Sequence, residues 1–156
     1  MKKVSIVAVI LWMSVIFYFS NQPAIVSTSQ SDKVIQALDK VSEDNNILGN
    51  ILEKLYELKG ANFIIRKAAH MISYLILAVL SFIMVYCNIV NISLSIKYGF
   101  LISLLYAIFD EIHQVFIPGR AGMIQDVLID SVGIVIGLSI IFIIFRILKN
   151  NKKIGF

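Results

Sequence analysis

Four stretches of the chain are long and apolar enough to cross a lipid bilayer as helices. Crossing the hydrocarbon layer takes about 20 mainly apolar residues. The stretches that meet this requirement are residues 4–20, 66–86, 92–113 and 126–148. Each has to be helical, because backbone groups in lipid have no water to bond, and none alternates as a barrel strand does. We therefore predict an all-α, polytopic membrane bundle of four transmembrane helices, forming a single domain over residues 1–156.

The composition fits a chain whose surface is largely covered by lipid. Hydrophobic residues make up 58% of the chain and charged residues 15%, against roughly 45–50% and about 25% in soluble domains. The single cysteine, Cys87, excludes an intrachain disulfide framework and a cysteine-rich metal site. The net charge of +4 suggests membrane lipids as partners. Nucleic acid is not expected as a partner, because the basic residues are split between two faces.

Charge near the chain ends favours cytoplasmic N- and C-termini. The total of basic residues is equal on the two sides, seven on each. However, Lys2 and Lys3 adjoin the first span without a nearby acidic residue, and the cluster from Arg146 to Lys153 also lacks acidic residues. A cleaved signal peptide is the alternative for the first stretch. That stretch is long for such a peptide, and no clear cleavage site follows it.

The first loop carries a second hydrophobic pattern. Residues 31–59 contain two series of apolar residues at helical spacing, separated by a polar break at Asn45-Asn46. This pattern predicts two short amphipathic helices that lie on the bilayer surface or cap the bundle. Ser31, just before the first series, is a plausible N-cap. With cytoplasmic termini, the loop is extracytoplasmic.

Ionisable residues gather where the second span begins, the third ends and the fourth begins. These three ends lie on one membrane face, opposite both termini, whichever face is outside. A charge at the centre of a membrane helix costs about 2.5–3.5 kcal/mol, so the residues are expected to pair, collect water or form a functional pocket. The candidates are Arg66, Lys67, His70 and Tyr74 in the second span, Asp110, Glu111, His113 and Gln114 in the third, Arg120 in the connecting turn, and Asp126 and Asp130 in the fourth.

Spacing in the fourth span indicates which way its acidic residues face. Asp126 and Asp130 are four residues apart, and the same stripe continues into Gly133 and Gly137. A pair of glycines at this spacing lets another helix approach closely. We therefore expect the acidic stripe to face the bundle interior. Arg120 has two open interpretations: its guanidinium pairs with one of these carboxylates, or it binds a phosphate or carboxylate of a ligand.

These motifs resemble those of the VanZ-like family. The stretch from Asp110 to Arg120, followed by the acidic and glycine stripe, is similar to the family signature, and Lys67, His70 and Tyr74 match its second-span element. Ser20-Asn21-Gln22-Pro23 resembles its polar exit from the first span. Asp130 departs from the pattern, because the family often carries Asn there. The resemblance implies a bacterial cytoplasmic-membrane protein whose motif face is outward, in a family implicated in reduced susceptibility to lipoglycopeptides such as teicoplanin.

Three functions are compatible with these features. In the first, an outward-facing polar pocket binds an amphiphile, which is a lipid, a lipid-linked wall precursor or the antibiotic. In the second, Asp, Glu and His act as acid and base on such a molecule, or hold a divalent ion that activates water. No dense metal-binding motif is present, so we expect neither a cofactor nor a metal site. Transport ranks last, because four spans leave little room for alternating access.

Overall fold

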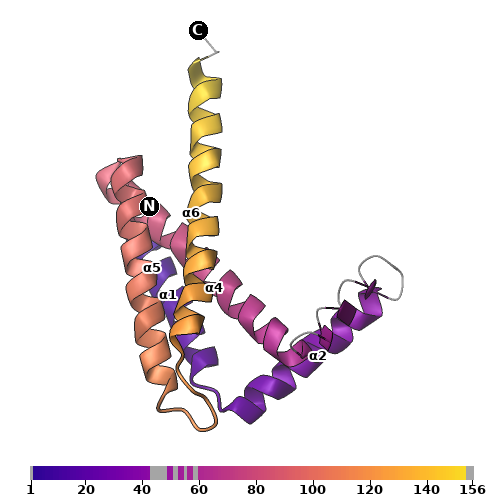
Figure 1. The fold of residues 1–156 in the computed structure, drawn as a ribbon. Coiled ribbons are helices and arrows are strands. Elements are labelled where there is room, and N and C mark those ends of the chain that lie inside the picture. Colours follow the sequence, from indigo (N-terminus) through magenta and orange to yellow (C-terminus); the bar gives the residue numbers. More distant parts are fainter. Residues whose placement is uncertain (1, 43–48, 51–52, 55, 58–59, 154–156) are drawn as a thin grey trace.

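Every regular element is helical in the part of the chain that the structure describes. The computed structural model describes residues 2–42, 49–50, 53–54, 56–57 and 60–153. Its helices are α1 (Lys2–Ser20), α2 (Ala24–Ser42), α4 (Ala61–Ile89), α5 (Ile92–Gln114) and α6 (Ile124–Lys153) (Figure 1). By length and composition, α1, α4, α5 and residues 124–148 of α6 can cross a membrane. The predicted all-α fold with four transmembrane helices is therefore confirmed.

The observed spans begin and end within a few residues of the predicted ones, and α4 differs most. It runs from Ala61 to Ile89 instead of 66–86. The turn into α5 is tight. The N–H of Val90, which has φ +54°, donates to the carbonyl of Tyr86, and the side chain of Asn91 accepts the Leu94 N–H at 3.0 Å. A left-handed residue ends one helix and an Asn cap begins the next.

Helix α4 is central to the fold, because it packs against α1, α2, α5 and α6. One face of α4 carries Tyr74, Leu77, Ala78 and Phe82, all fully buried. Their spacing of three or four residues places them on one side of the helix. The core is completed by Val9 and Ile16 of α1, Ala107 of α5, and Ile134 and Leu138 of α6.

The two glycines of α6 lie where this helix meets α4. A Cβ atom built on Gly133 would overlap the carbonyl oxygen of Met71, and one built on Gly137 would lie 2.6 Å from that of Leu75. Both glycines are buried. The absence of side chains at these positions therefore allows the two backbones to approach, which brings the acidic residues of α6 up against α4.

Helix α1 is attached to the bundle by side chains that bond to backbone carbonyls. Nε1 of Trp12 donates to the carbonyl of Ser73 at 2.9 Å, and the hydroxyl of Tyr106 donates to that of Met13 at 2.7 Å. These bonds connect α1 to α4 and to α5. They fix the height of α1 in the bundle, and so the position of its polar exit.

The first loop differs from its prediction. Helix α2 begins at Ala24. The carbonyl of Pro23 accepts the first helical hydrogen bond, from the N–H of Ser27, and proline is common at helix starts. Ser31 therefore lies inside α2 and does not cap it; its hydroxyl donates to the Ser27 carbonyl at 3.1 Å. Helix α2 lies beside the start of α4 (Figure 1). The second predicted amphipathic helix falls largely outside the described residues.

Candidate functional site

A polar cavity lies at the end of the bundle where α4 and α6 begin and α5 ends. Its volume is about 200 Å³, and its walls come from these helices and from the loop after α5. The loop after α5 and the end of α1 are together at the bottom of Figure 1. Of the site residues predicted from the sequence, those that line this cavity are Arg66, Lys67, His70, Gln114, Arg120 and Asp126.

Lys67 and Asp126 form an ion pair across the cavity wall, from α4 to α6. Their side chains are only 14% and 17% exposed. The ammonium group of Lys67 also lies over the ring of Phe63, at 5.3 Å from its centroid. The positive charge of Lys67 is thus neutralised within the protein, which makes this residue a structural link more than a contact for a ligand.

Asp110 belongs to a buried network at the side of the cavity. Its Oδ2 accepts hydrogen bonds from the hydroxyl of Ser20 at 2.7 Å and from Nε2 of Gln114 at 3.1 Å. All three side chains are buried. Sequence reasoning quoted Ser20 only within the polar exit of the first span. Its role as a partner of Asp110 was missed, because no local pattern connects residues that lie so far apart in sequence.

Arg120 holds the loop after α5 against the end of α1. Its guanidinium donates to the carbonyl of Gln22 at 2.9 Å, to that of Phe19 at 3.2 Å and to Oε1 of Gln114 at 3.2 Å. All three acceptors are neutral. The predicted alternative in which Arg120 pairs directly with Asp126 or Asp130 is therefore wrong.

The turn before Arg120 explains its position. The N–H of Arg120 donates to the carbonyl of Ile117 at 3.1 Å, and Gly119 has φ +75°, the value that a type II turn requires after proline. Burial, together with the nearby positive charge of Arg66, lowers the pKa of Arg120. A guanidinium nevertheless stays charged at neutral pH.

Arg66 is the second guanidinium that lines the polar cavity. Within the described part of the chain, the ion pairs are those of Lys67 with Asp126 and of His70 with Asp130, and neither includes Arg66. The cavity therefore has two arginines whose charges are not neutralised by a directly bonded carboxylate of the described residues.

An apolar cavity of about 290 Å³ adjoins the polar one. It lies between α1, α2 and α4, and its walls include Trp12, Ile16 and Val34. Three residues line both cavities, namely Arg66, His70 and Arg120. A polar compartment and an apolar compartment thus share a wall that carries positive charge.

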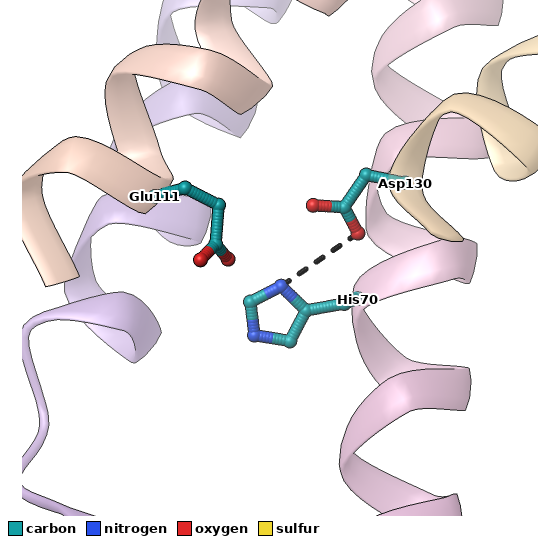
Figure 2. A group of neighbouring side chains, drawn as sticks. All are labelled: His70, Glu111 and Asp130. Atoms are coloured by element: carbon teal, nitrogen blue, oxygen red, sulfur yellow. Dashed lines mark ion pairs between the residues drawn. The ribbon is translucent and has the colours of Figure 1, made fainter. Parts of the chain in front are cut away.

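His70, Glu111 and Asp130 converge from three helices, α4, α5 and α6 (Figure 2). Nδ1 of His70 lies 3.8 Å from Oδ1 of Asp130, and one ligand atom from each residue lies within 4.8 Å of the others. Asp130 is fully buried and Glu111 is 5% exposed. The sequence analysis named all three residues but had no basis for separating them from the other candidates.

Two further predicted residues, like Asp110, Glu111 and Asp130, do not line the polar cavity. His113 faces the end of α1, where its Nε2 is 3.3 Å from Oδ1 of Asn21 and its ring centroid is 4.8 Å from that of Phe17. Tyr74 belongs to the buried core, with its ring centroid 6.4 Å from that of Tyr106. Neither side chain lines the polar cavity.

The comparison with known proteins agrees with the resemblance of the motifs. The family model VanZ/LLP1 matches residues 5–146, which is nearly the whole chain. No curated protein and no solved structure matches the chain. The matched region contains all four membrane-spanning helices except the ends of α1 and α6, as well as every residue of the two cavities. This chain is a membrane protein that belongs to the VanZ/LLP1 family.

Proposed function

We propose that this protein binds an anionic amphiphile at the outer face of the bacterial cytoplasmic membrane, with both termini in the cytoplasm. The ligand class is a phosphate- or carboxylate-bearing lipid, a lipid-linked cell-wall precursor or a lipoglycopeptide such as teicoplanin. The observation that supports this most is the pair of adjoining cavities, one polar and one apolar, with Arg66, His70 and Arg120 lining both. An amphiphile has the same two-part character.

Electrostatics favours an anionic headgroup in the polar cavity. Arg66 and Arg120 line the same cavity, and the positive charge of Arg66 contributes to the lowered pKa of Arg120. Guanidinium groups bind phosphate and carboxylate through two parallel hydrogen bonds. An anion placed between these two arginines would relieve their repulsion, whereas Lys67 is already neutralised by Asp126. The two arginines are therefore the proposed headgroup contacts.

The apolar cavity suits the hydrocarbon chain of the same ligand. Most of its exposed wall is apolar, and the aliphatic and aromatic side chains that contribute to it come from α1 and α4 and, as Val34, from α2. Burial of a hydrocarbon chain contributes about 0.8 kcal/mol per CH₂ group when the chain comes from water. Because a membrane lipid is already surrounded by hydrocarbon, the apolar cavity gives selectivity for chain shape, and the arginines give most of the affinity.

Trp12 allows a direct test, because it is the chain's single tryptophan and it lines the apolar cavity. The protein is placed in nanodiscs of unlabelled phosphatidylcholine, and phosphatidylglycerol with brominated chains is titrated in. Quenching of the Trp12 fluorescence then measures how much of the apolar cavity the brominated lipid occupies. We expect stronger quenching than with brominated phosphatidylcholine. Arg66→Gln should weaken binding of the anionic lipid about tenfold, as loss of a charge-assisted hydrogen bond predicts.

Arg146→Gln is the matched control, since Arg146 is an exposed arginine near the opposite end of α6. It should leave the quenching curve unchanged. Equal quenching by the two lipids, together with no effect of Arg66→Gln, would reject an anion-selective pocket.

A role in reduced antibiotic susceptibility has its own test. Expression of the chain in a teicoplanin-susceptible bacterium should raise the inhibitory concentration of teicoplanin, and Arg120→Ala or Asp126→Ala should abolish that protection. Membrane levels of each variant are compared by immunoblot. If both variants protect as well as the wild type, the polar cavity is not responsible for protection.

The location of His70 favours a second candidate, an enzyme that modifies a lipid or wall precursor. His70 borders both cavities and lies beside two carboxylates, where a side chain can transfer protons to or from a bound headgroup. Mass spectrometry of lipids from cells that express wild type or His70→Ala tests this candidate. A modified lipid present only with the wild type would establish a reaction, and identical lipid profiles would exclude one on the lipids of that host.

A further inference from the structure

The carboxylates of Glu111 and Asp130 are buried but incompletely bonded. Both oxygens of Asp130 and Oε1 of Glu111 have no hydrogen-bond partner among the described residues. The other oxygen of Glu111 accepts the backbone N–H of Met123 at 3.1 Å. An unsatisfied buried polar group destabilises the folded protein, and more so when it is charged. Two such groups that point into one space are stabilised when a cation lies between them.

The basic side chains nearby are bonded elsewhere or lie too far away. Lys67 is paired with Asp126, and Arg120 donates to neutral acceptors. His70 is the basic residue in ion-pair range of Asp130, but its 3.8 Å separation is too long for a hydrogen bond. The bonding capacity of the two carboxylates is therefore directed into the space that they share with the imidazole (Figure 2).

We propose that His70, Glu111 and Asp130 bind one divalent transition-metal ion of the Zn²⁺ or Mn²⁺ class. One imidazole nitrogen and two carboxylate oxygens form a donor set that such ions accept. Two negative charges balance a divalent cation, and an imidazole that ligates a metal adds no charge. Charge balance matters because Asp130 is fully buried and Glu111 is 5% exposed.

The dimensions of the cluster fit this ion size. In tetrahedral geometry, bonds of about 2.0–2.2 Å place neighbouring ligand atoms about 3.4 Å apart, and the ligand atoms of the cluster lie within 4.8 Å of one another. An ion that binds there would draw the three side chains together by rotation about their χ angles. Three protein ligands leave a coordination position open for water or for an oxygen of a bound molecule.

The site also has a path by which an ion can enter. The side chain of His70 is 19% exposed, and it lines both the polar and the apolar cavity. An ion can therefore reach the imidazole first and then the two buried carboxylates. This inference goes beyond the proposed amphiphile binding and does not depend on it, because the two arginines are not among the ligands.

The proposal is tested by titration calorimetry on the purified full chain in detergent. The protein is first treated with a chelator and desalted, and Zn²⁺ alone is then the titrant. We expect saturable binding of one ion per chain. Asp130→Asn and Glu111→Gln should each weaken that binding about tenfold or more. Co²⁺ provides a spectroscopic measurement, since its visible absorption band changes when nitrogen and carboxylate ligands replace water.

Controls separate this site from ordinary surface binding and from the amphiphile pocket. His113→Gln removes the chain's other histidine, and Glu57→Gln removes an exposed carboxylate; both should bind Zn²⁺ as the wild type does. Arg66→Gln should also retain Zn²⁺ binding while it loses the preference for anionic lipid, so the two proposals can fail independently.

Absence of saturable Zn²⁺ and Co²⁺ binding by the wild type would overturn the proposal, whatever the variants do. Unchanged binding in both Asp130→Asn and Glu111→Gln would also overturn it. Thermal unfolding of each variant without metal shows whether it is folded. If Asp130→Asn does not fold, Glu111→Gln and His70→Gln take its place.

Discussion

The hydroxyl of Ser20 donates a 2.7 Å hydrogen bond to Oδ2 of Asp110, which joins the last residue of α1 to the last turns of α5. Both side chains are buried, at 2% and 1% exposure. A carboxylate at this depth depends on the donors that surround it. This bond therefore helps to close the bundle on the side where the two cavities lie.

Ser20→Ala should destabilise the protein measurably. The substitution removes one of the two hydrogen bonds to Oδ2 of Asp110, and a bond to a charged group contributes about 1.5–3 kcal/mol. Unfolding by sodium dodecyl sulfate in mixed micelles measures the change. Ser14→Ala is the control, because Ser14 is exposed on the same helix and bonds only within it, to Ile10. Equal stability of the two variants would contradict the importance of this bond.

The ion pair between Lys67 and Asp126 should show strong coupling in a double-mutant cycle. Lys67→Met and Asp126→Asn each leave a largely buried partner unpaired, and we expect a loss of about 1–3 kcal/mol from either change. The double variant should lose less than the sum of the two, with a coupling energy of about 0.5–3 kcal/mol. The same unfolding experiment gives the three values. Strict additivity would show that the two charges do not stabilise each other.

Gly133→Ala should weaken the packing of α6 on α4. The added methyl group meets the backbone carbonyl of Met71, which cannot rotate away, and overpacking of this kind costs about 1–3 kcal/mol. Val135→Leu also adds one carbon, but at a position that is 53% exposed. Thermal unfolding in detergent should therefore show a lower Tm for the glycine variant alone. A Tm reduced equally by both substitutions would argue against close helix contact.

The proposed orientation predicts which loops are accessible from outside the cell. Cys87→Ser removes the native thiol, after which Ser29→Cys in α2 and Ser93→Cys at the start of α5 each introduce one exposed site. A membrane-impermeant maleimide added to intact cells should label position 29 and leave position 93 unlabelled until the cells are opened. The reverse pattern would place the polar cavity on the cytoplasmic side.

The membrane fold could be predicted from hydropathy because lipid imposes a simple rule of length and polarity. The common location of the ionisable residues also followed from topology alone, since consecutive spans alternate in direction. The connecting turn that carries Arg120 was also expected, and Arg120 is the last residue of that turn.

The pairing within the polar layer could not be predicted in the same way. Arg120 bonds to one carbonyl at the end of α1 and to another just after it, and backbone carbonyls carry no signal in the sequence. His113 lies two residues after Glu111, on nearly the opposite side of the helix, so that its ring faces α1 while Glu111 faces His70. Such choices depend on the rotation of each helix about its axis, and that rotation is set by packing.

The border of the apolar cavity by α1, α2 and α4 has a consequence for how occupancy depends on supply. In the proposed binding, a lipid that entered between these helices would come sideways out of the surrounding leaflet without crossing an aqueous phase. Its binding would then be governed by its mole fraction in that leaflet, a two-dimensional concentration. Dilution of the bulk medium would leave such a complex intact, whereas the arrival of competing anionic lipids would displace it.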